Sequence, residues 1–157
     1  MKKILFLIIL LSTFLLFSQE KNQNTLHWSA DFAAVKKQAK AENKPILIIF
    51  TESNRCELCS MFDTDFLKAK KFKEIAKDKL ILYKAYFPRK KGVISPKQKQ
   101  INRQLDSTYS KTRRKRAFPT IIFVNSSGEE LGFLESYNYI HDTSKHFSLL
   151  EAVLKKY

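Results

Sequence analysis

Two cysteines are the residues of this chain whose type and spacing are best suited to chemistry. Cys56 and Cys59 are its only cysteines, and they lie in the stretch FTESNRCELCSMF, residues 50–62. A pair with two residues between them can be a redox couple, half of a metal site or a short structural disulfide. A structural disulfide at this spacing would close a very small loop, so it would remove little entropy from the unfolded chain. The residues alone therefore favour redox chemistry.

The metal alternative needs further ligands, and the sequence does not place them at a familiar spacing. His27, His141 and His146 are scattered, and with the two cysteines they match no common zinc finger. We predict no bound metal, and we expect His141 and His146 on the surface beside the start of the last helix. The sequence shows no discernible phosphate-binding loop, carboxylate pair, or flavin or nicotinamide motif, so we predict no cofactor.

The first residues, MKKILFLIILLSTFLLFSQE, indicate an exported protein. Lys2 and Lys3 precede an apolar run, residues 4–17, that is shorter than the roughly 20 residues needed to cross a bilayer. We predict that residues 1–18 are a cleavable signal peptide and that the mature protein is secreted or periplasmic. The alternative is an uncleaved membrane anchor, because Leu16 stands where a cleavage site usually has a small residue.

Residues 19–157 suit one compact α/β domain that places the cysteines after a buried strand. Residues 46–50, ILIIF, are a continuous apolar run, and the stretch from Cys56 can open a helix that continues to Lys79. Further helices are predicted at 29–43, capped by Ser29, at 95–109 and from Thr143 or Ser144 onward, and further strands at 80–87, 121–124 and 130–135. This order predicts a mixed sheet with helices on both faces, ending in a hairpin and a C-terminal helix.

Two stretches of the chain resemble the signatures of the thioredoxin-like family. KPILIIFTESNRCELC, residues 44–59, is similar to the family's strand, loop and CxxC, and FPTIIFVNSSGEELG, residues 118–132, is similar to its second signature. The preceding WSADFAAVKKQAKAENKP resembles the helix of exported members, so the resemblance covers about residues 25–157. It implies the thioredoxin fold and thiol–disulfide exchange.

The resemblance also assigns roles to individual residues. It implies that Cys56 is the nucleophile and that Cys59 is the thiol that resolves the mixed disulfide. It implies that the Phe118-Pro119 bond is cis and faces the cysteines, where the backbone at these residues would pair with an extended substrate segment.

The residues around the cysteines depart from the family's common pattern. Arg55 stands where many members have Trp, and Glu57 and Leu58 stand where many have Gly-Pro. We expect these three residues to tune the redox potential, with Arg55 favouring the Cys56 thiolate and Glu57 opposing it. The alternative is that Arg55 and Glu57 are solvated loop residues with no such role. The buried acid of thioredoxins is missing, because its counterpart lies near Ile49 in an apolar run. Glu52 could relay protons in place of this acid, but we expect it to be an exposed, inert loop residue.

The sequence is strongly basic, with 29 Lys and Arg against 15 Asp and Glu and a net charge of +14. Part of this charge forms a run immediately before Phe118-Pro119, which consists of Lys111, Arg113, Arg114, Lys115 and Arg116. The run could recruit an acidic protein or a polyanionic envelope surface, or it could be a solvated loop. Nucleic acid is disfavoured, because the protein is expected to be exported and no aromatic residues interleave the run.

We therefore predict a thiol–disulfide oxidoreductase that acts on protein disulfides in the cell envelope. A reductive or isomerising role is favoured, because Glu57 opposes the thiolate stabilisation that makes a strong oxidant. The protein would need an upstream electron donor. The alternative is a non-catalytic binding module whose CxxC holds a metal or an inert disulfide and whose basic surface binds an acidic partner.

Overall fold

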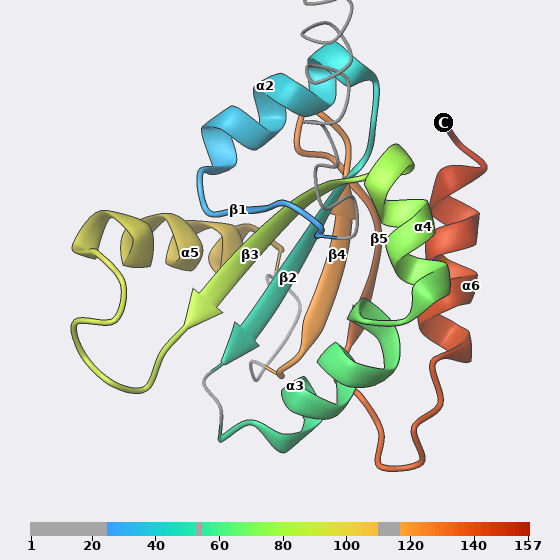
Figure 1. Cartoon of the computed structure of the whole chain (residues 1–157). Coiled ribbons are helices and arrows are strands. Elements are labelled where there is room, and N and C mark those ends of the chain that lie inside the picture. Colours follow the sequence, from blue (N-terminus) through green and yellow to red (C-terminus); the bar gives the residue numbers. More distant parts are fainter. Residues whose placement is uncertain (1–24, 53–54, 110–116) are drawn as a thin grey trace, which may run out of the picture.

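A five-stranded mixed sheet forms the centre of the protein (Figure 1). The computed structural model describes residues 25–52, 55–109 and 117–157, so the predicted signal peptide and the basic run at 111–116 lie outside the described residues. The strands follow the spatial order β1-β3-β2-β4-β5. Their bounds are β1 (Trp28–Ser29), β2 (Ile46–Glu52), β3 (Ile81–Phe87), β4 (Thr120–Val124) and β5 (Glu130–Glu135). β2 pairs in parallel with β3 and antiparallel with β4, and β4 and β5 form the predicted hairpin.

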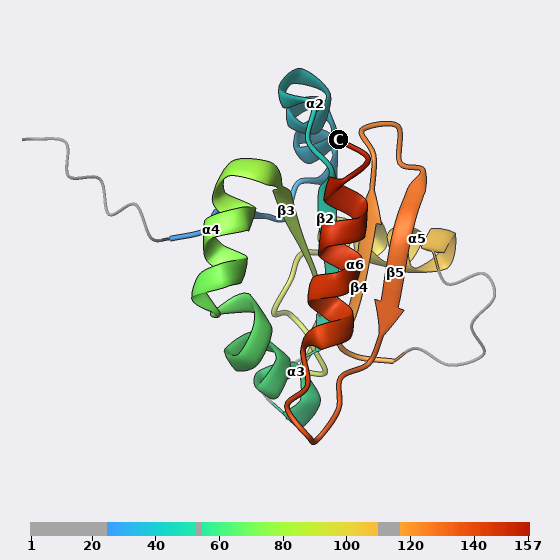
Figure 2. The same ribbon diagram turned by 90° about the vertical axis from the view of Figure 1, so that its right-hand side faces the viewer.

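Helices cover both faces of this sheet, as predicted. They are α2 (Phe32–Glu42), α3 (Glu57–Phe62), the π-helix η1 (Asp63–Leu67), α4 (Lys70–Lys79), α5 (Pro96–Tyr109) and α6 (Ser144–Leu154). Side chains of β2 alternate between the faces: Leu47 and Ile49 join the core with α3, α4 and α6, whereas Ile48 and Phe50 join the core with α2 and α5. Figure 2 shows α4 and α6 side by side on the face to which Leu47 and Ile49 point. No helix within the described ranges combines the length and hydropathy needed to span a bilayer.

The predicted start of the first helix is wrong for an identifiable reason. Asp31, not Ser29, caps α2, because its carboxylate accepts hydrogen bonds from the N–H groups of Ala33 and Ala34 at 3.0 and 3.1 Å. Ser29 instead ends β1, where it pairs with Tyr83 of β3.

The helix predicted from Cys56 to Lys79 is interrupted between η1 and α4. Phe66 and Phe72 are six residues apart, so a continuous α-helix would direct them to different faces. The break at Lys68 and Ala69 brings both rings into one core, with their centroids 4.7 Å apart.

The prediction of a surface position is confirmed for His141 and is wrong for His146. His146 is buried, and its ring centroid lies 4.9 Å from that of Phe62. It shares one face of α6 with Leu150 and Val153, at the spacing expected of a buried stripe. That spacing is the signal that could have identified it.

Candidate active site

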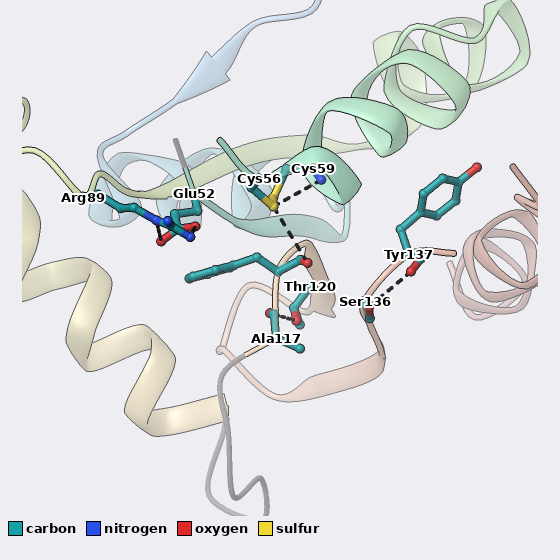
Figure 3. The surroundings of a disulfide bond; sticks show 9 residues. Glu52, Cys56, Cys59, Arg89, Ala117, Thr120, Ser136 and Tyr137 are labelled. Atoms are coloured by element: carbon teal, nitrogen blue, oxygen red, sulfur yellow. Dashed lines mark hydrogen bonds and ion pairs between the residues drawn. A yellow bond between two sulfur atoms is a disulfide. The ribbon is translucent and has the colours of Figure 1, made fainter. Parts of the chain in front are cut away.

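The two cysteines lie at the start of α3, directly after the loop that follows β2 (Figure 3). Cys56 is the N-cap residue with an extended backbone, and Cys59 lies in the first turn of the helix. Their sulfur atoms are joined in a disulfide. Cys56 is half-buried, whereas Cys59 is only 8% exposed. A partner disulfide can therefore approach Cys56 more easily than Cys59.

A backbone N–H group of the helix start contacts the Cys56 sulfur. The N–H group of Cys59 donates a hydrogen bond to Cys56 Sγ at 3.2 Å. A helix start concentrates N–H groups that have no partner within the helix, and such donors favour a thiolate over a thiol. The position of Cys56 is therefore suited to a nucleophile once the disulfide is reduced.

Phe118 and Pro119 lie beside this sulfur, at the start of β4. The Phe118-Pro119 bond is cis, as the resemblance implied, and the Phe118 carbonyl oxygen lies 4.0 Å from Cys56 Sγ. The hydroxyl of Thr120 donates a hydrogen bond to the Ala117 carbonyl at 2.7 Å, so the segment around Pro119 is held on both sides (Figure 3). This arrangement brings the two sequence signatures together.

The three residues expected to tune the site have different environments. Arg55 and Glu57 are exposed, and Leu58 is half-buried against the core beneath α3. Charges exposed to water interact weakly because solvent and salt screen them. The structure therefore gives Arg55 and Glu57 little electrostatic leverage on Cys56.

Glu52 is not the exposed loop residue that we expected. It is the last residue of β2, its side chain is 18% exposed, and it forms a two-point ion pair with Arg89. Arg89 Nε and Nη2 each donate to a carboxylate oxygen of Glu52 at 2.8 Å (Figure 3). These hydrogen bonds lower the pKa of Glu52, so it is a poor proton acceptor near neutral pH. Sequence reasoning missed this pair, although both residues lie where two adjacent parallel strands end.

Among the described residues, no three or more His, Cys, Asp or Glu side chains are grouped as a metal site would require. His146 packs against Phe62 of α3, and His141 lies beside Asp65 of η1, whereas His27 lies just before β1. Within the described ranges, none of them is part of a ligand cluster with Cys56 and Cys59.

The fold combines a mixed sheet with a CxxC disulfide at a helix start and an adjacent cis-proline. Comparison with known proteins identifies the family that has this combination. A family model described as a thioredoxin-like domain matches residues 32–148. The chain belongs to this family.

Two relatives are similar over most of the folded region. The chain is 29% identical over 106 residues to the disulfide bond reductase DsbH of Chlamydia pneumoniae, a match that covers 68% of this chain and 60% of that protein. The chain thus spans less than two thirds of the length of this curated relative. A solved structure named DsbH oxidoreductase superposes with a TM-score of 0.71 at 25% identity and covers 88% of this chain and 92% of that chain.

A thioredoxin from Thermus thermophilus is a more distant structural neighbour. Its solution structure gives a TM-score of 0.52 at 18% identity, covering 83% of this chain and 86% of that chain. This likeness concerns the fold alone.

Proposed function

We propose that this chain is a thiol–disulfide oxidoreductase that acts on protein disulfides through Cys56 and Cys59. One observation carries the proposal: a more accessible Cys56 and a buried Cys59 share one helix start beside the cis Phe118-Pro119 bond. The disulfide bond reductase to which the chain is similar supports a reductive direction. The predicted signal peptide, residues 1–18, supports an action in the cell envelope.

The proposed reduction proceeds in two thiol–disulfide exchanges. The Cys56 thiolate attacks one sulfur of the substrate disulfide, forms a mixed disulfide and releases the other substrate sulfur as a thiolate. Cys59, deprotonated, then attacks Cys56 Sγ, forms the Cys56–Cys59 disulfide and releases the second substrate thiolate. Two electrons pass to the substrate, so an upstream dithiol donor must reduce the protein again.

Phe118 and Pro119 are proposed to align the substrate during these exchanges. Pro119 has no N–H group and is buried, and the Phe118 carbonyl faces the Cys56 sulfur at 4.0 Å. An extended substrate segment could donate a backbone hydrogen bond to this carbonyl while its cysteine meets Cys56. Of the three residues predicted to tune the redox potential, Leu58 is proposed to act through packing, and Arg55 and Glu57, which are exposed, are proposed to act only weakly.

Trapping of the mixed disulfide tests this function directly. Cys59→Ser lacks the resolving thiol, so it should retain disulfide-linked proteins on Cys56 when it is incubated with an envelope extract. Cys56→Ser is the matched control and should retain none, and the wild-type protein should reduce insulin with a thiol donor. The absence of both trapped proteins and insulin reduction would refute the proposal and favour a binding module with an inert disulfide.

A further inference from the structure

A hollow of about 290 Å³ lies where the ends of β2 and β3 meet the start of α5. Its walls come from the end of β3, the loop that leads to α5, and the first turns of α5, and Phe118 closes the side nearest the cysteines. This volume is at the lower end of ligand pockets, so it suits one or two side chains better than a cofactor. We call it the basic pocket, after the cations in its lining: Arg89, Lys90, Lys91, Lys99 and Arg103.

Most of the positive charge of the basic pocket is not compensated by acids in its lining. Glu52 is the only acid among the described residues that line it, and both of its carboxylate oxygens are already bound by Arg89. Lys99 and Arg103 are one helical turn apart on α5 and are exposed, so both can turn toward a bound anion. An anionic group in the pocket would therefore lie near several cations, and the single acid of the lining would repel it little because it is already paired with Arg89.

Phe118 connects the basic pocket to the reactive sulfur. Its carbonyl oxygen lies 4.0 Å from Cys56 Sγ, while its ring packs against Phe87 in the pocket wall with centroids 5.4 Å apart. A substrate segment that follows the Phe118-Pro119 backbone with its cysteine at Cys56 therefore places neighbouring residues over the pocket. A carboxylate on one of these neighbouring residues would lie within reach of the pocket cations.

We propose that the basic pocket selects disulfide-bonded protein substrates that carry Asp or Glu next to the reactive cysteine. This inference rests on the proposed oxidoreductase function and adds the substrate class to it. Charged pairs that are partly exposed each contribute modestly, so removal of two pocket cations should slow reaction with such a substrate by about 3- to 20-fold.

A pair of matched peptides tests the inference. Both contain one disulfide with a fluorophore and a quencher, and they differ only in having Glu or Gln at two positions beside the cysteine. The second-order rate constant for reduction of each peptide is measured with pre-reduced protein. Wild-type protein should prefer the Glu peptide, and Lys99→Gln combined with Arg103→Gln should abolish most of this preference. High salt should reduce it as well.

Two further variants make the test specific to the basic pocket. Lys37→Gln combined with Lys40→Gln removes the same charge from α2, which lies at the end of the sheet away from α3 (Figure 1), and should leave the preference unchanged. Glu52→Gln should increase the preference, because it releases Arg89 to bind the substrate.

The outcomes separate this inference from the function on which it rests. The inference would be overturned if wild-type protein reduced the two peptides at equal rates, or if the Lys99 and Arg103 variant preferred the Glu peptide as strongly as wild-type protein does. The oxidoreductase function would stand in both cases. Failure of wild-type protein to reduce even the Gln peptide would overturn both.

Discussion

Asn102 is a buried polar side chain whose removal should cost more stability than most single substitutions. It is 1% exposed on α5, and its amide makes three hydrogen bonds. Its Oδ1 accepts from the Tyr83 hydroxyl and from Gln98 Nε2, each at 2.9 Å, and its Nδ2 donates to the Tyr86 carbonyl at 2.8 Å. The side chain thus ties α5, which forms one wall of the basic pocket, to β3.

The size of the effect follows from the groups that Asn102→Ala would leave behind. The Tyr83 hydroxyl would lose its acceptor and the Tyr86 carbonyl would lose this donor, at about 1–3 kcal/mol for each buried group left unsatisfied. Gln98 would still donate to Tyr83, and the neighbouring pocket admits water, so the lower part of that range applies to each group. We expect the free energy of unfolding to fall by about 2–4 kcal/mol.

Urea unfolding of the oxidised protein, followed by circular dichroism, measures this loss. The midpoint of thermal unfolding should fall by about 5–15 °C for a chain of this size. Gln104→Ala on the exposed face of α5 is the control and should change stability by no more than about 0.5 kcal/mol. A loss below about 1 kcal/mol for Asn102→Ala would show that water replaces the amide fully and would refute the reasoning.

Two predictions concern protons in the core beneath α3. Burial lowers the pKa of His146 below 6.5, so acidification should destabilise the protein, because the unfolded chain binds a proton that the folded chain excludes. Stability should fall with pH between about 6.5 and the lower folded-state pKa, with a slope of at most about 1.4 kcal/mol per pH unit in a urea unfolding series. His146→Phe should remove this component, and an unchanged slope would contradict the assignment. Burial and the hydrogen bond that Tyr137 donates to Asp65 raise the pKa of Tyr137 to about 12. In an ultraviolet titration, Asp65→Asn should lower the pKa of Tyr137 toward 10.0. An unchanged pKa would exclude the contribution of Asp65.

The sequence predicts those parts of the fold that depend on local pattern. The apolar run at 46–50, the helix that begins at Pro96 and the hairpin that begins at Thr120 each carry a clear periodic or compositional signal, and each is present. The resemblance also gave the cis bond before Pro119 correctly, because the bond belongs to a family signature and not to a local preference.

The parts that the sequence predicts poorly depend on contacts between distant segments. The break at Lys68 and Ala69 exists because Phe66 and Phe72 must enter the same core, a requirement that no local pattern states. The pair between Glu52 and Arg89 depends on the parallel register in which Glu52 lies opposite Phe87, so it becomes visible only when the strands are aligned.

The charges around the site fall into two groups: those near Cys56, which largely cancel, and the cations of the basic pocket. The charges nearest the end of β2 cancel within the Glu52–Arg89 pair, and Arg55 and Glu57 are exposed and opposite in sign. Stabilisation of a Cys56 thiolate is therefore left mainly to the N–H groups of the helix start, such as that of Cys59. The remaining cations of the basic pocket line the hollow together with Phe118, and in the inference proposed above they act on the substrate. Under the proposed function, removal of Lys99 and Arg103 should change the rate with acidic substrates and leave the reduction potential of the cysteine pair unchanged.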